Sequence, residues 1–260
     1  MLEAKNYHSS TEAKQQFLSV SQFKEFRECE ARALARIKGE YGQKKSKALD
    51  VGQYVHAWSE GALEQFIEAN KSSVYKKTGD KGKYDDYVKA DQAIAALTMD
   101  SLAMKALEGE KEAVLTGTID GVEWRGMVDV LGAQHFSDLK YVKDFEPIYS
   151  SRYRKRLSWI EYWGYDLQMA VYQNLICQNT GKTLEPLIVA VTKETPPDKG
   201  IFGGFADDEM AQALAYIEAM QPRIVDVKNG TDEPIPCNRC DYCRSIKRLV
   251  LVQKWSDIPA

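Results

Sequence analysis

The sequence lacks the segments that direct a protein into a membrane or out of the cell. No run of eighteen apolar residues occurs among its 260 residues, so no stretch predicts a membrane-spanning helix. The N-terminus, MLEAKNYHSSTEAKQQ, has neither the basic region nor the apolar stretch of a secretory signal. Internal repeats and low-complexity segments are also missing. We therefore expect a cytoplasmic protein with no membrane partner.

An excess of positive charge is missing as well. The chain has 35 Lys and Arg against 38 Asp and Glu, a formal net charge of -3. A nucleic-acid partner would have to bind a local basic patch, because the field of the whole chain does not attract it. Hydrophobic residues make up 44% of the chain, which is enough to pack the core of one large domain or two small ones.

Cysteine is scarce, and its placement is informative. Five cysteines in an intracellular chain favour metal binding or buried thiols over structural disulfides. Three of them, in PIPCNRCDYCRSIK, form a C-x2-C-x2-C run at Cys237, Cys240 and Cys243. The short loops of such a run can wrap thiolates around one metal centre. Cys177 is interpreted as a buried small hydrophobic residue.

Helical periodicity dominates the first hundred residues. A helix is expected to begin after Ser19 or Ser21, because either hydroxyl can cap its first turn. A second helix is expected from about residue 51 to 69 and a third from about 84 to 107, both from apolar residues at helical spacing. Residues 1–109 are therefore predicted to form a mostly helical N-terminal part.

The period changes to two at residue 110. The segment EAVLTGTIDGVEWRGMVDVLGAQHFSDLKYV predicts three strands of an antiparallel meander, with turns at Asp120-Gly121 and near Gly132. A helix of about twenty residues ending near Gly181, buried strands in PLIVAVTKE and GIFGGF, and a last helix over 207–227 follow.

Together these elements predict the α+β class, with a central mixed β-sheet flanked by helices. We expect a single domain over residues 1–260. Its sheet and long helix would occupy residues 110–205, and a C-terminal helix with the cysteine-rich tail would occupy residues 206–260.

Acidic side chains lie where the second and third strands of the meander should carry core residues. Asp138 and Lys140 are two apart in a strand and share a face, while Leu139 points the other way. Asp129 lies on the preceding strand. Two carboxylates that approach each other repel unless a cation intervenes, and oxygen donors of this kind suit Mg²⁺ or Mn²⁺. With a lysine nearby, the set suits phosphodiester hydrolysis. The alternative is a solvated edge strand.

Two helical pairs extend this set. His56 and Glu60 are four apart on one helix face, where a neutral imidazole could complete the ligands of a metal. The alternative is a packed or surface histidine. Gln168 and Tyr172 have the same spacing, and the alternative for them is an amphipathic boundary pair.

The ordered motifs resemble the PD-(D/E)XK nuclease superfamily, in its RecB-like branch. Within that branch GMVDVL, FSDLKYV and WIEYWGYDLQMAVYQNL look like the phage and prophage RecE-like (exonuclease VIII) group. The resemblance covers about residues 18 to 244 and implies a restriction-endonuclease-like fold. The order of motifs that carries it is His56, then Asp129, then Asp138-x-Lys140, then Gln168-x-x-x-Tyr172.

The resemblance implies a role for each motif residue. It implies a divalent metal, Mg²⁺ or Mn²⁺, held by His56, Asp129, Asp138 and the carbonyl of Leu139, with Lys140 as the catalytic lysine. Gln168 and Tyr172 would orient that lysine and the DNA end. The sequence departs from the pattern in having Val128 where proline precedes the first aspartate. Glu60 and Glu112 are acidic and suitably placed, but no role is assigned to them.

The resemblance also implies a fourth cysteine ligand. RecB-like nucleases of the AddB kind combine one early cysteine with a late triplet around a [4Fe-4S] cluster, and Cys29 takes the early position here. The triplet in this chain lacks the longer final gap of AddB, so zinc and a metal-free thiol cluster stay open as alternatives. A shared centre would pin the N-terminal helix to the C-terminal end and would be structural.

A basic run separates the acidic strands from the long helix. SSRYRKRLSW contains Arg152, Arg154, Lys155 and Arg156, which would contact the DNA backbone beside a phosphate-cleaving site. Otherwise the run is a solvated loop. Lys193 is a weaker contact residue of the same kind.

Two functions follow. The first is a metal-dependent DNA exonuclease of phage or prophage recombination, which would resect linear duplex ends for a RecT-like annealing protein. The resemblance to RecE-like enzymes also implies a homo-oligomeric ring in a bacterial or phage-encoded system. The second is a non-catalytic DNA-end-binding or assembly module with a structural metal cluster. The intact acid-acid-lysine set favours the first, while cleavage polarity and strand preference stay open.

Overall fold

A computed structural model describes residue 7 and residues 10–42, 46–77 and 82–248, together with 252 and 254. The outermost residues of the expected 1–260 domain lie outside these ranges, and the division into three parts stays a prediction. Among the described helices, none combines the length and the apolar character needed to cross a bilayer.

The centre of the fold is a five-stranded mixed sheet with the order β1-β2-β3-β6-β7. The first three strands form the expected antiparallel meander, β3 pairs with β6 in parallel, and β6 pairs with β7 antiparallel. Asp120 and Gly121, which both have positive φ, make the two-residue turn between β1 and β2. The predicted α+β class with a central mixed sheet is therefore confirmed. The strands are β1 (Glu110–Ile119), β2 (Val122–Leu131), β3 (His135–Val142), β6 (Glu185–Thr192) and β7 (Lys199–Phe202).

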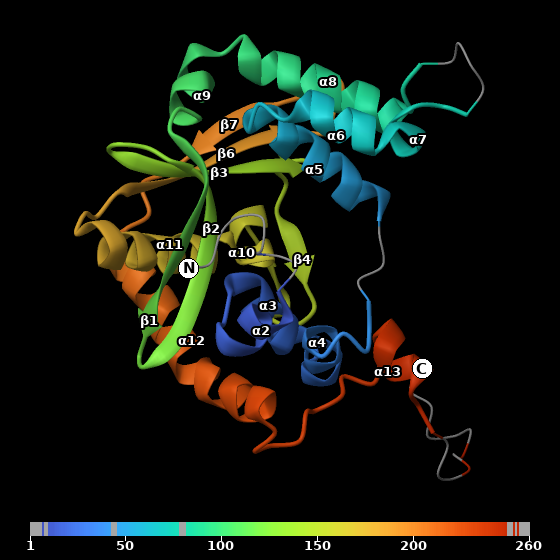
Figure 1. Ribbon diagram of the computed structural model, residues 1–260, viewed down its shortest axis with the longest axis vertical. Coiled ribbons are helices and arrows are strands. Elements are labelled where there is room, and N and C mark those ends of the chain that lie inside the picture. The colour runs from blue at the N-terminus through green and yellow to red at the C-terminus, as the bar shows by residue number, and fades with distance from the viewer. Residues whose placement is uncertain are drawn as a thin grey trace.

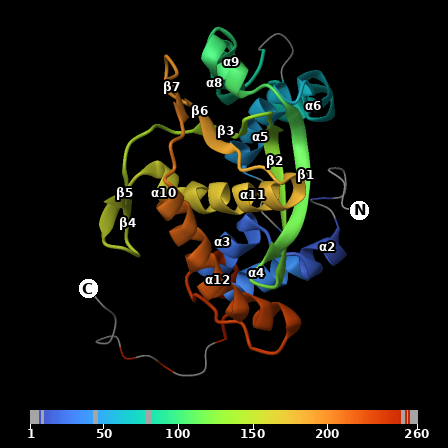
Figure 2. The same cartoon turned by 90° about the vertical axis from the view of Figure 1, so that its left-hand side faces the viewer.

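Helices cover both faces of this sheet (Figure 1). One layer contains α5 (Lys47–Ser59), α6 (Leu63–Ala69), α8 (Asp85–Thr98) and α9 (Ser101–Ala106). The other contains α3 (Val20–Glu28), α4 (Glu30–Ile37), α11 (Tyr165–Thr180) and α12 (Asp207–Asn229), and Figure 2 shows α11 lying across the sheet.

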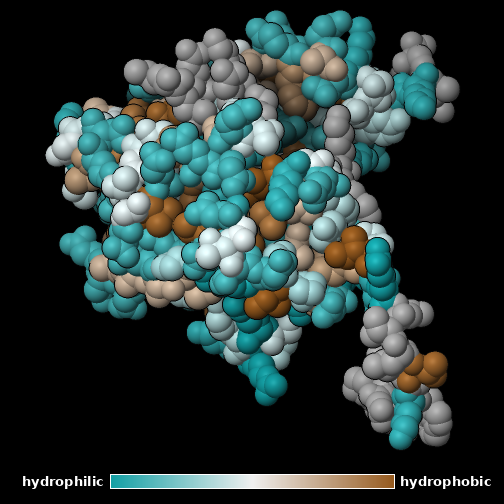
Figure 3. Space-filling model, turned by 60° about the horizontal axis from the view of Figure 1, so that its bottom comes forward, coloured by the Kyte–Doolittle hydropathy of each residue, from teal (hydrophilic) through white to brown (hydrophobic). Residues whose placement is uncertain are grey.

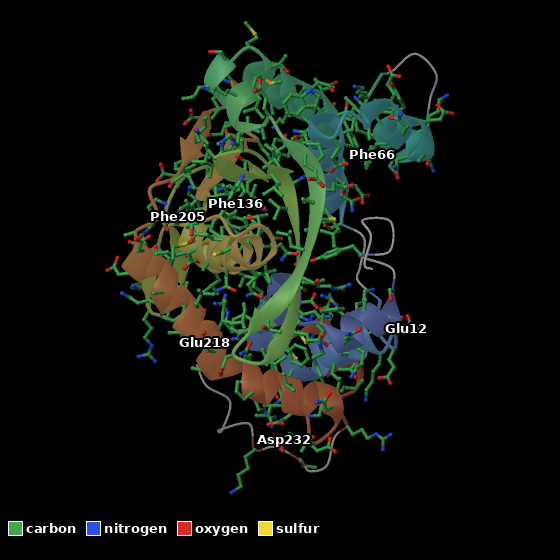
Figure 4. The ribbon with its side chains drawn as sticks, turned by 60° about the vertical axis from the view of Figure 1, so that its left-hand side comes forward. Glu12, Phe66, Phe136, Phe205, Glu218 and Asp232 are labelled. Atoms are coloured by element: carbon green, nitrogen blue, oxygen red, sulfur yellow. The ribbon has the colours of Figure 1, made fainter. Side chains whose placement is uncertain are left out.

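Each layer has its own core. Val189 and Val191 of β6 pack with the first layer, and Ile188 and Ala190 pack with the second, so this strand is buried on both faces and reads as a continuous apolar run. Phe136 of β3 belongs to the second core and lies near the centre of the molecule (Figure 4).

Helices expected to be continuous are interrupted at single residues. The helix that starts after Ser19 breaks at Cys29, which has extended backbone angles and separates α3 from α4. Gly61 (φ 74°) follows the end of α5, and Gly164 (φ 63°) separates α10 (Trp159–Trp163) from α11. Asp100 ends the third helix early because its carboxylate caps α9 through the N–H groups of residues 102 and 103. Periodicity does not reveal such breaks, because the apolar stripe resumes beyond each one.

Some short elements were not expected. The basic run is not a simple loop, because β4 (Ile148–Ser150) and β5 (Lys155–Leu157) pair there as an antiparallel hairpin. The sequence analysis also does not predict the short helices α2 (Thr11–Gln16), α7 (Lys71–Val74) and α13 (Asp241–Ser245).

The interpretation of Cys177 as a buried residue is wrong. Its side chain is exposed. Leu175 and Ile176 are fully buried against the sheet, and the next position on α11 therefore turns toward solvent.

Candidate active site

The acidic residues lie where β2 and β3 separate. The two strands pair at Val130–Ser137 and Leu131–Phe136. Beyond this short ladder the Asp129 carboxylate takes the place of a backbone acceptor, because its Oδ2 accepts a hydrogen bond of 2.8 Å from the N–H of Leu139. At this point α5 and α11 approach the acidic residues from the two faces of the sheet.

Asp138 is the most enclosed member of the site, with 1% of its surface exposed. Its Oδ1 accepts a 2.6 Å hydrogen bond from the Gln168 amide, and its Oδ2 contacts the Lys140 ammonium. Burial raises the pKa of Asp138, and the charge of Lys140 opposes that rise. The structure thus brings Asp138, Lys140 and Gln168 together, but it places the Gln168 amide on Asp138 rather than on the lysine.

Lys140 is enclosed between Asp138 and an aromatic ring. Its Nζ lies 4.7 Å from the ring centroid of Tyr165. Burial would lower the pKa of Lys140, but the carboxylates of Asp138 and Asp129 outweigh burial and raise it. The ammonium therefore stays charged.

His56 reaches the site from the opposite face, on α5. Its Nδ1 lies 3.5 Å from Asp129 Oδ2. Glu112 on β1 lies across from Asp129, between the pairs Lys111–Val130 and Ala113–Val128, and it has a positive φ of 51°. Burial, and then the charge of Glu112, raise the pKa of Glu60. The two glutamates without an assigned role therefore lie near Asp129.

Tyr172 is also buried. It is 8% exposed, and its ring packs so closely on β2 that a Cβ at Gly126 would lie 2.9 Å from its Cε1. Burial raises the pKa of this tyrosine well above its ordinary value. Its expected contact with a DNA end stays a prediction.

Two residues of this site had not been identified from the sequence. Tyr165 contacts Lys140, and it lies three residues before Gln168, a helical spacing that could have indicated it. Lys24 on α3 lies over the same ring, 5.0 Å from its centroid. No local pattern indicates Lys24, because it reaches the site through the packing of α3.

The donor set fits a divalent cation. An imidazole nitrogen and carboxylate oxygens are ligands that Mg²⁺ and Mn²⁺ bind, and Asp138 Oδ2 is a buried oxygen whose partner among the described residues is the Lys140 ammonium. His56, Asp129 and Asp138 are nevertheless less tightly clustered than the cysteines. Among the described residues, only the four cysteines form a group of His, Cys, Asp or Glu whose ligand atoms all lie within 4.8 Å of one another.

The four cysteines meet at the break between α3 and α4. The distances from Sγ to Sγ are 3.5 Å for Cys29 and Cys243, 3.8 Å for Cys240 and Cys29, and 3.9 Å for Cys237 and Cys243. A tetrahedral zinc ion with Zn–S bonds of about 2.3 Å holds its sulfurs about 3.8 Å apart. The spacing therefore suits four thiolates around one ion.

Backbone amides support these sulfurs. The N–H of Cys240 donates to Cys237 Sγ at 3.3 Å, and the N–H of Cys243 donates to Cys240 Sγ at 3.5 Å. Burial would raise the pKa of Cys237, but the N–H groups of Arg239 and Cys240 outweigh it and lower that pKa to about 6. The chain thus favours a thiolate at this position, the form that binds metal.

Polar contacts also hold the C-terminal segment on α4. Glu30 Oε2 accepts a hydrogen bond of 2.8 Å from the N–H of Ile235 and pairs with Arg223, which also pairs with Asp232. Around the sulfurs, Cys29, Ala31 and Cys243 are buried. The lower face of the molecule is mainly hydrophilic, with apolar side chains in small separate patches (Figure 3). The sulfur centre and the contacts of Glu30 therefore both link the two ends of the fold in this region.

The basic run lies at the tip of the β4–β5 hairpin, which stands at the side of the molecule (Figure 2). Arg152, Arg154, Lys155 and Arg156 are all exposed there. Tyr149 and Tyr153 are 60% and 49% exposed beside them. The Arg152 guanidinium donates to the carbonyl of Arg27 at 3.3 Å, which links the hairpin to α3.

A cleft of about 750 Å³ separates the hairpin from α12. Basic, acidic and aromatic side chains share its lining, and Phe205 marks its edge near the start of α12 (Figure 4). The lining includes Arg27, Tyr153, Lys155, Asp166 and Tyr216.

Comparison with known proteins relates this arrangement to nucleases. The family described as "PDDEXK-like domain of unknown function (DUF3799)" matches residues 19–246. A crystal structure from Eubacterium rectale, named "Putative exonuclease", is similar with a TM-score of 0.90 and 33% sequence identity, covering 98% of this chain and 96% of that one. Comparison with curated proteins finds no match.

Proposed function

The chain belongs to this family of PDDEXK-like domains, and from that premise we propose that it is a metal-dependent exonuclease that cleaves phosphodiester bonds at the ends of linear duplex DNA. The contact of Lys140 with the buried carboxylate of Asp138, across from Asp129, carries the proposal. A largely covered lysine that is paired with one of two acids costs free energy unless the set has a function. An intact set therefore favours catalysis over a non-catalytic module.

A divalent cation, Mg²⁺ or Mn²⁺, held by His56, Asp129, Asp138 and the Leu139 carbonyl would lower the pKa of a bound water and neutralise phosphate charge. The N–H of Leu139 fixes the Asp129 carboxylate, and the Gln168 amide fixes that of Asp138.

Lys140 acts as a cation rather than as a base in this scheme. Its pKa is raised by the neighbouring carboxylates, so it keeps its proton while it stabilises negative charge on the oxygens of the scissile phosphate. The ring of Tyr165 limits where the ammonium can move.

The DNA duplex would lie along the hairpin. The four exposed basic side chains of its tip would bind backbone phosphates, and Tyr149 and Tyr153 offer faces on which unpaired bases can stack. The resemblance to RecE-like enzymes further suggests a ring of identical subunits, a RecT-like annealing partner and a role in phage or prophage recombination in the bacterial cytoplasm.

The cysteine centre would bind one zinc ion. The separations of 3.5 to 3.9 Å support zinc over [4Fe-4S], because each thiolate of such a cluster binds a different iron and lies farther from the others. The centre would hold the C-terminal segment on α4 and take no part in hydrolysis.

A cleavage assay on end-labelled linear duplex tests the catalytic proposal. We expect degradation in Mg²⁺ or Mn²⁺, no degradation in EDTA, and protection of covalently closed circles. The position of the label also reports polarity. DNA binding without cleavage in every metal would instead favour the non-catalytic module.

A further inference from the structure

Lys24 is a second lysine at the active site, and the hydrolysis scheme does not use it. It projects from α3 so that its Nζ lies 5.0 Å from the ring centroid of Tyr165, while Lys140 Nζ lies 4.7 Å from the same centroid. Both distances fall within cation–π range, so one ring contacts two ammonium groups.

Unlike Lys140, Lys24 has no carboxylate within ion-pair distance among the described residues, although the charges of Asp138 and Asp166 favour its ammonium form. Within the described ranges it forms no ion pair and no hydrogen bond, although most of its surface is covered. The Asp138 carboxylate is already engaged by Lys140 and Gln168. Burial, and then the charge of Lys140, lower the pKa of Lys24 to about 7.

Lys228 shows how this fold treats a lysine with a structural role. It is also covered, but its Nζ donates to the carbonyl of Phe17 at 2.9 Å and so links α12 to the N-terminal segment. A covered ammonium without such a partner costs free energy, so Lys24 destabilises the free protein.

The backbone is shaped around the Lys24 side chain. Gly164, between α10 and α11, has a φ of 63°, and a Cβ there would lie 3.1 Å from Lys24 Cε and 3.8 Å from Arg27 Nη2. A glycine suits this position because it adopts a positive φ without strain and because it leaves room for the side chains of Lys24 and Arg27.

Further basic side chains lie between Lys24 and the β4–β5 hairpin. Arg27 follows Lys24 by three residues on α3, so the two share a helix face. Arg27 also lines the cleft with Lys155 and accepts the hydrogen bond from Arg152 through its carbonyl. Positive side chains thus lead from Lys140 past Lys24 and Arg27 to the hairpin.

We propose that Lys24 binds a backbone phosphate of the substrate DNA strand, next to the phosphate that is cleaved. This inference rests on the proposed nuclease function. A phosphate supplies the missing anion, and a compact ammonium suits it as a point charge. The phosphate also separates Lys24 from Lys140 electrostatically, so DNA relieves the repulsion that the free protein carries.

DNA binding in EDTA tests the proposal without cleavage. Fluorescence anisotropy of a labelled linear duplex is measured over a salt series for the wild type, Lys24→Met and Lys24→Arg. Lys105→Met, exposed on α9, controls for the loss of one positive charge. We expect Lys24→Met to weaken binding about tenfold. We also expect its slope of log affinity against log salt to fall by about 0.9, the value of one phosphate contact on duplex DNA, with the slope kept in Lys24→Arg.

Thermal unfolding separates this role from a packing role. Lys24→Met should melt at or above the temperature of the wild type, because an unpaired covered charge is removed, whereas Lys228→Met should melt lower. Binding and salt slope equal to those of Lys105→Met would overturn the proposal, as would a lower melting temperature with unchanged binding. If the wild type neither binds nor cleaves DNA, both the proposal for Lys24 and the proposed nuclease function fail. If the wild type cleaves DNA but the Lys24 variants bind it like the wild type, only the proposal for Lys24 fails.

Discussion

The Asp129 carboxylate accepts a 2.8 Å hydrogen bond from the backbone N–H of Leu139 at the point where β2 leaves β3. This bond joins a side chain of one strand to the backbone of the next, directly beside Asp138. Asp129 therefore has two separable roles. It accepts the hydrogen bond from the Leu139 N–H, and it supplies a negative charge to the active site.

Asp129→Asn and Asp129→Ala separate these tasks. The amide oxygen of asparagine can still accept from Leu139 N–H, so the asparagine variant should unfold like the wild type yet lose at least a hundredfold in cleavage. The alanine variant should lose cleavage and also about 1 kcal/mol of unfolding free energy, because the N–H loses its partner. Denaturant unfolding and end-labelled cleavage measure the two effects. Near-normal cleavage by the asparagine variant would remove Asp129 from the site.

Asp138 and Lys140 should be coupled in stability as well as in activity. Asp138→Ala should abolish cleavage. It removes the repulsion between the Asp129 and Asp138 carboxylates, but it also leaves the covered Lys140 ammonium without its anion, so we expect the variant to be less stable than the wild type. Breaking a buried pair costs about 3–5 kcal/mol, and removing both partners costs much less. A double-mutant cycle with Lys140→Met measures this coupling through unfolding free energies. Additive effects would show that the two side chains do not interact in solution.

The hairpin should contribute to DNA affinity without contributing to stability. The triple variant Arg154→Ala, Lys155→Ala, Arg156→Ala removes three exposed charges, and Arg152 is kept because it bonds to Arg27. The salt slope of binding should fall by about 2 to 3 while the melting temperature stays unchanged. Three exposed lysines elsewhere, Lys71, Lys105 and Lys182, provide the matched control. If the control variant loses as much of the salt slope, the effect comes from the total charge of the protein and not from the hairpin.

The lowered pKa of Lys24 predicts how stability changes with pH. The unfolded lysine titrates near 10.5 and the folded one near 7, so between these values the unfolded state binds more protons and the unfolding free energy rises with pH. Burial, and then the charges of Lys140 and Arg27, lower the pKa of Lys24, whereas the charges of Asp138 and Asp166 raise it. Lys24→Met should be more stable than the wild type by about 1–2 kcal/mol near pH 7, since partial exposure reduces the full effect, and the difference should vanish by pH 10.5. Urea unfolding in EDTA across this range is the measurement, and a difference that does not depend on pH would assign the effect to packing.

Some of this site could be predicted from the sequence because its signals are local. Asp138 and Lys140 stand out as charges inside a strand, and a period of two places them on one face. His56 and Gln168 have only a weak local signal, their four-residue spacing to Glu60 and Tyr172, and their helices approach β3 from opposite faces. The register that brings them together depends on packing of the whole sheet.

Other features depend on contacts between distant parts of the chain. Cys29 breaks a helix whose apolar stripe continues through it, and the partner that favours the break, Cys243, is far along the sequence. Lys24 carries no local signal either, because a lysine on an amphipathic helix usually faces water. The sequence predicts one helix through Gly164, but the positive φ of this residue ends α10 and leaves room for Lys24.

The sulfur centre should bind one zinc ion per chain and hold the C-terminal segment. Closing a loop from Cys29 to Cys237 costs entropy that grows slowly with length, by about 0.6 kcal/mol for each doubling, whereas a structural zinc ion contributes on the order of 10 kcal/mol. Cys29→Ser should therefore lower zinc content and melting temperature and expose the chain beyond α12 to protease, while Cys177→Ser, which changes an exposed thiol outside the centre, should do neither. Elemental analysis and visible absorbance on protein purified without oxygen are the measurements. Iron with acid-labile sulfide in place of zinc would show that the thiolates spread around a cluster, and full zinc content in Cys29→Ser would show that Cys29 is not a ligand.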